Sequence, residues 1–253
     1  MEEQRIWTAA LVVIGDEILS GRTQDKNVAQ VATWLNEQGI RLAEVRVVPD
    51  DEQRIAEAVN ALRGTHDYLF TTGGIGPTHD DITVDSIAAA LGVPVVVHPE
   101  ARRILEDYYS ARGLKVNEAR LRMARVPQGA ELIANPASGA PGVRVGNVYI
   151  LAGVPHIAAS MLEALSGTLQ GGRPMVSVTL GAYAAESDVA GLLREAEAAH
   201  PGVAVGSYPF FKDGRFGGNF VVRSADGEAA RRCADDLRGK LSKAGYEVVD
   251  GGI

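Results

Sequence analysis

The sequence predicts a doubly wound α/β domain with a mostly parallel sheet, followed by a small ferredoxin-like α+β domain. Short apolar runs alternate with amphipathic helical patterns over the first two thirds of the chain. The first run, residues 8–14, is apolar at nearly every position, which is typical of a parallel strand covered on both faces. After a linker at residues 170–174, the order changes to β-α-β-β-α-β.

The elements of the first domain, residues 1–170, follow one another regularly. Strands are predicted at residues 8–14, 42–48, 68–72 and 95–97. Helical periodicity covers residues 28–35, 55–62 and 84–91, and these runs are followed by Gly39, Gly64 and Gly92, where left-handed C-caps are expected. Further helices are expected at residues 99–112, 117–125 and 155–169, with a hairpin at residues 143–145 and 148–151.

The second domain, residues 171–253, has the same kinds of signal in a different order. Strands are predicted at residues 176–180, 203–208, 218–223 and 246–249, and helices at residues 187–200 and 226–244. The one cysteine, Cys233, lies on an apolar helical stripe with Leu237 and Leu241, so we interpret it as a core residue.

Composition excludes several classes of protein. The net charge is −7 and no basic run is present, which argues against a nucleic-acid partner. The longest strongly apolar run, residues 9–14, is far shorter than the roughly 20 residues of a membrane helix, so no membrane partner is expected. The N-terminal residues lack the apolar core of a signal peptide, and we therefore expect a cytoplasmic protein.

Two motifs follow strands that we expect to be parallel. Gly15, Asp16 and Glu17 come directly after the first strand, and a glycine-rich stretch, residues 71–81, ends the third strand and continues beyond it. Because parallel strands end at one edge of a sheet, both motifs are expected to face one ligand crevice. The glycine-rich stretch contains Thr72, Gly73, Gly74, Gly76, Pro77, Asp80 and Asp81, and Thr83 follows at the start of a helix.

The glycine-rich loop predicts a site for a phosphorylated small molecule. Glycines let backbone N–H groups approach an anion closely. Asp80 and Asp81 would repel a phosphate unless a cation lay between them, so we expect a divalent metal such as Mg²⁺, Mn²⁺ or Co²⁺. Asp16 and Glu17 are further candidate metal ligands.

Structural interpretations of these residues remain open at this point. Asp80, Asp81 and Thr83 also suit the first turn of a helix, as caps and dipole partners. Asp16 and Glu17 could be solvated loop acids. A later stretch, residues 135–142, is either a ligand-shaping loop or a simple turn.

The two motifs, in this order and spacing, resemble the N-terminal domain of the competence/damage-inducible CinA protein family, part of the molybdopterin-binding MoaB/Mog superfamily. The resemblance covers residues 5–170, and the tail resembles the small domain that follows in that family. It implies that Asp80 and Asp81 are catalytic and that both also bind metal together with Asp16 and Glu17. The implied ligand-binding residues are Gly15, Asp16, Glu17, Asn27, Thr72, Gly73, Gly74, Gly76, Pro77, Thr83, Gly139, Pro141 and Gly142.

The resemblance implies a metal-dependent hydrolase of a nucleotide diphosphate such as ADP-ribose or FAD. Alternatives are a molybdopterin adenylyltransferase and a non-catalytic pterin- or nucleotide-binding module. Potassium is a further candidate cofactor, molybdopterin a candidate ligand, and a homo-oligomer the expected assembly. Ala152 and Ile157 depart from the family's pattern. The C-terminal deamidase domain of full-length members is expected to be absent.

Overall fold

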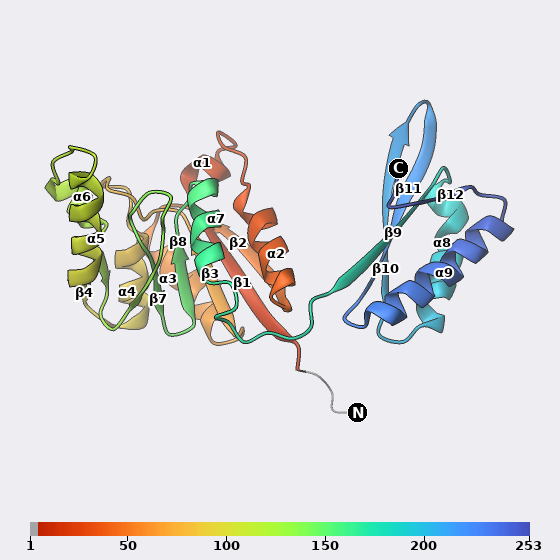
Figure 1. Ribbon diagram of the computed structural model, residues 1–253, viewed down its shortest axis with the longest axis horizontal. Helices are drawn as coiled ribbons and strands as arrows, with labels where there is room; N and C mark the ends of the chain where they lie inside the picture. Colours follow the sequence, from red (N-terminus) through yellow and green to blue (C-terminus); the bar gives the residue numbers. More distant parts are fainter. Residues whose placement is uncertain (1–4) are drawn as a thin grey trace. The chain divides into compact units, whose positions relative to one another are not determined.

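The computed structural model describes residues 5–253, which form two compact units (Figure 1). The first unit ends at Gly172, two residues beyond the predicted boundary, and Arg173–Ile253 form the second. The Gly172 N–H donates to the Gly39 carbonyl at 3.0 Å, which holds the start of the linker to the first unit. Within residues 5–253, no helix has both the length and the apolar character needed to cross a membrane. Part of the segment used to exclude a signal peptide, residues 1–4, lies outside the described residues.

A six-stranded sheet in the order β2-β1-β3-β8-β7-β6 forms the centre of the first unit. Its first four strands are parallel, whereas β7 and β6 are antiparallel at one edge. This confirms the mostly parallel sheet and the predicted hairpin. The strands are β1 (Trp7–Ile14), β2 (Ile40–Val48), β3 (Tyr68–Thr72), β6 (Glu131–Ile133), β7 (Gly142–Val145) and β8 (Val148–Leu151).

Helices cover both faces of this sheet (Figure 1). Alternate residues of β1 enter two cores, with Leu11 on one face and Val12 on the other, and both are fully buried. The Leu11 core includes residues of α2 (Asn27–Glu37) and α7 (Pro155–Ala164), and the Val12 core includes residues of α3 (Glu52–Arg63) and α4 (Thr83–Leu91). Burial on both faces explains why the β1 sequence is continuously apolar.

A subdomain at one side of the sheet differs from the sequence prediction. It contains β4 (Val95–Val97), α5 (Pro99–Ser110), α6 (Glu118–Arg122) and β5 (Arg125–Pro127). The predicted strand 95–97 does not join the main sheet but pairs antiparallel with β5. The helix expected over residues 117–125 ends at Arg122, because the chain turns there into β5, which begins at Arg125 and pairs with β4.

Two helix ends also differ from the prediction. Gly64 has φ −89°, so the left-handed cap predicted there is wrong, although Gly39 and Gly92 adopt it. The turn after α3 stays right-handed because the amides of Thr65 and His66 both donate to the Leu62 carbonyl at 3.2 Å. The last helix of the first unit ends at Ala164, five residues earlier than expected.

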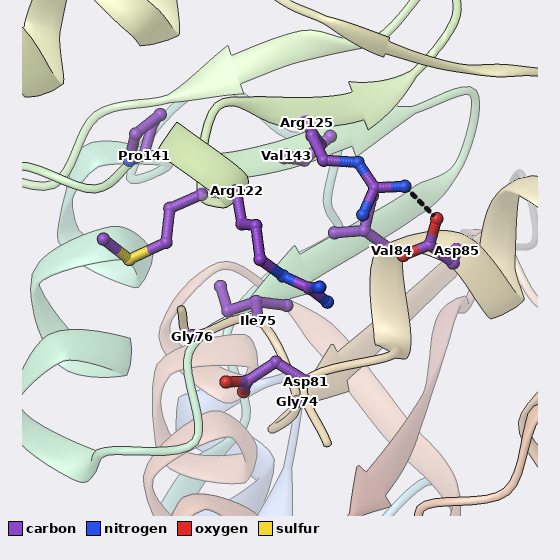
Figure 2. Close-up of a pocket in the computed structure, with 11 residues that line it drawn as sticks. Gly74, Ile75, Gly76, Asp81, Val84, Asp85, Arg122, Arg125, Pro141 and Val143 are labelled. Carbon is purple, nitrogen blue, oxygen red and sulfur yellow. Dashed lines mark hydrogen bonds and ion pairs between the residues drawn. The ribbon is translucent and has the colours of Figure 1, made fainter. Parts of the chain in front are cut away.

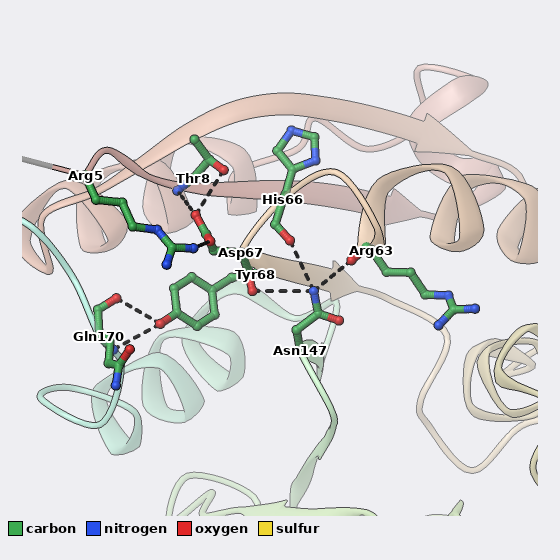
Figure 3. A network of polar contacts seen from close by, with 8 residues as sticks. All are labelled: Arg5, Thr8, Arg63, His66, Asp67, Tyr68, Asn147 and Gln170. Atoms are coloured by element: carbon green, nitrogen blue, oxygen red, sulfur yellow. Dashed lines mark hydrogen bonds and ion pairs between the residues drawn. The ribbon is translucent and has the colours of Figure 1, made fainter.

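A network of polar contacts stabilises the edge of the sheet at which β1 and β3 begin (Figure 3). The Asp67 carboxylate accepts the Thr8 N–H at 2.8 Å and pairs with Arg5. Partial burial opposes ionisation of Asp67, but these hydrogen bonds hold its pKa below the ordinary value. The Tyr68 hydroxyl donates to the Gln170 carbonyl at 2.8 Å, so the segment after α7 is attached to the start of β3.

The second unit is a four-stranded antiparallel sheet with two helices. Its strand order, β10-β11-β9-β12, confirms the predicted βαββαβ arrangement. Its elements are β9 (Val176–Ala182), α8 (Glu186–Ala199), β10 (Ala204–Lys212), β11 (Arg215–Ser224), α9 (Gly227–Lys243) and β12 (Val248–Asp250). Cys233 is fully buried in the core between sheet and helices, and burial raises the pKa of its thiol, as expected for a core residue.

Because each unit has its own apolar core, a core substitution is expected to act on one unit. Leu237→Ala removes a fully buried side chain from the second unit and should cost about 2–5 kcal/mol of its stability. Hydrogen exchange of the full-length Leu237→Ala variant should show lost protection in residues 173–253. Leu11→Ala should instead lose protection in the first unit. Equal loss in both units for Leu237→Ala would contradict separate cores.

Candidate functional site

The carboxyl ends of neighbouring parallel strands bring the predicted motifs to one edge of the main sheet. Asp16 and Glu17 form the start of a short helix after β1, α1 (Asp16–Leu19). Asp50 follows β2, which pairs with β1 on one side, and the glycine-rich loop follows β3, which pairs with it on the other. Gly153 follows β8, the next strand of the sheet. The topology therefore gathers four chain segments that are far apart in sequence.

Thr83 clamps the glycine-rich loop. Its hydroxyl donates to the Gly73 carbonyl at 2.8 Å and its N–H donates to the Gly74 carbonyl at 3.0 Å. A Cβ on Gly73, where φ is 102°, would lie 2.1 Å from the Ile14 carbonyl oxygen. A Cβ on Gly74, where φ is 65°, would lie 2.2 Å from the Thr83 hydroxyl oxygen. Both positions therefore require glycine, and the loop conformation is set by packing rather than by a ligand.

Neither aspartate of the loop caps the helix that follows. The N-cap of α4 is Ile82, and no side chain accepts a hydrogen bond there. Asp81 instead accepts the Thr78 N–H at 2.8 Å and the Thr78 hydroxyl, both on Oδ2. Asp80 is exposed. The capping interpretation of these two residues is therefore wrong, and only Thr83 has a structural role in the helix.

Asp50 belongs to the acidic group of the site, and our sequence analysis missed it. Its Oδ2 accepts the Asp16 N–H at 3.0 Å. Partial burial, and then the negative charges of Glu17, Asp16 and Asp80, raise the pKa of Asp50 above its ordinary value. Carboxylates from the loops after β1 and β3 therefore act on Asp50, which follows β2. The signal available in the sequence was the position of Asp50 just after a strand that adjoins β1.

The acidic group can hold a divalent metal only with help from a ligand. Within residues 5–253, no three His, Cys, Asp or Glu side chains come together as a ready ligand set. Mg²⁺ commonly takes one or two carboxylates and completes its shell with water and substrate phosphate oxygens. Asp16, Glu17, Asp50 and Asp80 supply hard oxygen donors and excess negative charge. They fit a metal bridged to a phosphorylated substrate, not a closed metal centre.

Two buried side chains beside the loop have unused hydrogen-bonding capacity. Asn27 is 4% exposed and donates through Nδ2 to the Gly153 carbonyl at 2.8 Å. Among the described residues, its Oδ1 and the Thr72 hydroxyl oxygen are buried without a hydrogen-bond partner. Buried polar atoms are normally satisfied, so unpaired ones at a predicted site are candidates for ligand contacts.

A small open pocket lies on the other side of the loop (Figure 2). Gly74, Gly76 and Asp81 form one wall. Arg122 and Arg125, which no motif in the sequence indicated, come from the subdomain and form part of the rest. Arg125 forms an ion pair with Asp85, whereas the Arg122 side chain extends toward the loop. Apolar lining comes from Ile75, Val84, Met123, Pro141 and Val143.

The later loop contributes less than expected. Of its three predicted ligand residues, only Pro141 lines the pocket. A Cβ on Gly139 would lie 2.4 Å from the Tyr108 ring, and Gly142 is buried in β7 beside Met161, so both serve packing. Asn135 donates to the Ser138 hydroxyl and to the Ala140 carbonyl, which shapes the turn. Pro77 is exposed and does not line the pocket.

Comparison with known proteins matches both units. The family described as "Probable molybdopterin binding domain" matches residues 10–171, and "FAD synthase, middle domain" matches residues 174–250. A protein of Aeropyrum pernix is 37% identical over 217 residues, covering 82% of this chain and 80% of that protein. A CinA-like protein of Desulfosudis oleivorans is 32% identical over 243 residues, covering 92% of this chain and 57% of that protein.

A solved structure shows the same relationship for the first unit. The crystal structure of the protein CinA from Thermoplasma acidophilum aligns with a TM-score of 0.59 and 32% identity, covering 64% of this chain and 98% of that chain. The family matches fall on the unit that carries the glycine-rich loop and on the βαββαβ unit that follows it. The chain therefore belongs to the CinA family, with a probable molybdopterin binding domain over residues 10–171 and a second unit that is similar to the FAD synthase middle domain.

Proposed function

We propose that the first unit hydrolyses the diphosphate bond of a nucleotide diphosphate such as ADP-ribose or FAD, with a divalent metal. The observation that carries this proposal is Asp50 beside a glycine-rich loop, with its pKa raised by burial and by repulsion from Glu17, Asp16 and Asp80. A cation bridged to phosphate oxygens would relieve that repulsion. The family matches to a molybdopterin-binding domain and a FAD synthase domain support a phosphorylated or nucleotide ligand.

Each part of the site has a role in this proposal. The amides of Gly74, Ile75 and Gly76 would hold the phosphate and stabilise negative charge as it develops, whereas the Gly73 N–H already donates to the Leu151 carbonyl at 3.3 Å. Asp16, Glu17 and Asp80 hold the metal, and Asp50 orients the backbone of Asp16. Bound metal would polarise the phosphoryl group and lower the pKa of water.

The proposed reaction breaks one phosphoanhydride bond. A water oxygen forms a new bond to one phosphorus while the bridging oxygen leaves with the other phosphate. With ADP-ribose the products are AMP and ribose 5-phosphate, and water loses one proton. Asp81 is assigned to accept that proton, because Oδ2 takes both hydrogen bonds from Thr78 and Oδ1 remains available.

Charge removal at the loop aspartates should abolish turnover without unfolding the protein. Asp80→Asn and Asp81→Asn are each expected to lower metal-dependent AMP release from ADP-ribose or FAD by at least about 10- to 100-fold. Asp107→Asn, at a carboxylate on α5 that is 68% exposed, is the matched control and should retain the wild-type rate. Wild-type rates in both loop variants would contradict the assignment, whereas AMP transfer to a pterin phosphate would favour the adenylyltransferase.

Asp50→Asn should change stability in a pH- and metal-dependent way. Because the folded pKa of Asp50 is raised, its contribution to stability is present below the ordinary value of 3.8 and is lost as pH rises through the folded pKa. The variant keeps an acceptor for the Asp16 N–H and should therefore melt higher than wild type at pH 7, with a smaller difference near pH 3.5.

The same melting curves test the proposed metal site. Mg²⁺ or Mn²⁺ should raise the melting temperature of the wild type at pH 7 more than that of Asp50→Asn. Asp107→Asn should respond to the metal as the wild type does. An equal response of Asp50→Asn and wild type would contradict a role of the acidic group in metal binding.

Potassium as a cofactor and self-association of the chain stay predictions. The first can be checked by assay in potassium-free buffer and the second by light scattering.

A further inference from the structure

Arg122 is a guanidinium group that faces the pocket without a counter-charge. Figure 2 shows its side chain reaching from α6 toward Ile75 of the glycine-rich loop. Within the described part of the chain, its Nε is buried without a hydrogen-bond partner, and the residue has no ion pair or ring contact. A buried N–H donor without an acceptor is unfavourable unless a ligand oxygen approaches it.

Neighbouring arginines are all engaged by the protein itself. Arg125 pairs with Asp85 at the rim of the same pocket. Arg120, two residues before Arg122 on α6, stacks over the Tyr109 ring at 4.2 Å and donates to the Lys115 carbonyl. Asp81, the carboxylate on the facing wall, is already hydrogen-bonded to Thr78 and forms no ion pair with Arg122. Arg122 is therefore the lining cation that remains available to a ligand.

We propose that Arg122 binds a phosphate or diphosphate group of the ligand, opposite the glycine-rich loop. Guanidinium groups suit this task because their planar N–H donors match two phosphate oxygens at once. The loop amides near Gly74 and Gly76 would contact the same anion from the other side. This inference rests on the proposed function only in taking the pocket as the phosphate site, and it does not require hydrolysis.

Because of the position of Arg122, the two sides of the site also favour different ligand groups. The acidic group after β1, β2 and β3 favours the binding of a cation. Arg122 favours the binding of an anion and needs no cation beside it to do so. A diphosphate offers two phosphates, so one can be bridged by metal to the acids and the other bound by Arg122. A ligand with phosphate groups is then preferred over its dephosphorylated form.

The test compares two arginines on one helix by calorimetric titration with ADP, pyrophosphate and adenosine, in Mg²⁺. Arg122→Gln is expected to weaken binding of ADP and pyrophosphate by about 10- to 100-fold, as for loss of a charge-assisted bidentate contact. Arg122→Lys should recover part of the affinity, and Arg120→Gln should bind as the wild type. Melting temperatures should be unchanged in Arg122→Gln, because the side chain has no partner to lose. Any weak adenosine binding should not depend on Arg122.

The possible outcomes separate this inference from the hydrolase proposal. Wild-type affinity of Arg122→Gln for both phosphate probes, or an equal loss for Arg120→Gln, overturns the role of Arg122. Binding that depends on Arg122 without ADP-ribose or FAD hydrolysis supports it and overturns only the hydrolase. Failure of the wild type to bind any of the three probes, ADP, pyrophosphate and a pterin monophosphate, overturns both the role of Arg122 and the hydrolase proposal. A pterin monophosphate that binds more tightly than ADP, with the same dependence on Arg122, identifies a pterin as the source of the phosphate.

Discussion

The site depends on the burial of β1 on both of its faces. Leu11 and Val12 point into different cores, so β1 must lie inside the sheet between two parallel neighbours, β2 and β3. All three strands then end at the same edge, which places Asp16, Asp50 and the glycine-rich loop together. At the opposite edge, Asp67 and Tyr68 form hydrogen bonds to segments near the two ends of the unit. The carboxyl ends of the strands are therefore left to form the ligand site.

The glycine-rich loop lies between the acidic group and the pocket lined by Arg122. On one side, burial and the negative charges of Glu17, Asp16 and Asp80 raise the pKa of Asp50. On the other side, Arg122 lacks a counter-charge among the described residues. Neither the repulsion at Asp50 nor the unpaired Arg122 Nε has an evident structural role. A ligand that brings both phosphate and a cation would satisfy them together, and this complementarity links the proposed hydrolysis to the inferred binding by Arg122.

Rigidity of the loop is supplied from within the first unit. Thr83 holds the carbonyls of Gly73 and Gly74, and neither position has space for a side chain. The N–H groups of the loop are thus oriented before a ligand arrives, which is what electrostatic stabilisation of a reacting phosphate needs. The sequence showed the glycines, but the Thr83 clamp depends on the packing of α4 against the sheet.

By itself, the sequence determined the two-unit order, the mostly parallel sheet and the glycine-rich loop, because these follow from local periodicity and from glycine positions. Only the tertiary structure revealed Asp50 and Arg122, since each meets the site through long-range packing. Asp50 does follow a strand, but the fold decides that this strand adjoins β1. The tertiary structure also excluded the cap role of Asp81, whose carboxylate accepts hydrogen bonds from Thr78, and showed that Gly139 packs against the Tyr108 ring, because both depend on neighbours that folding supplies.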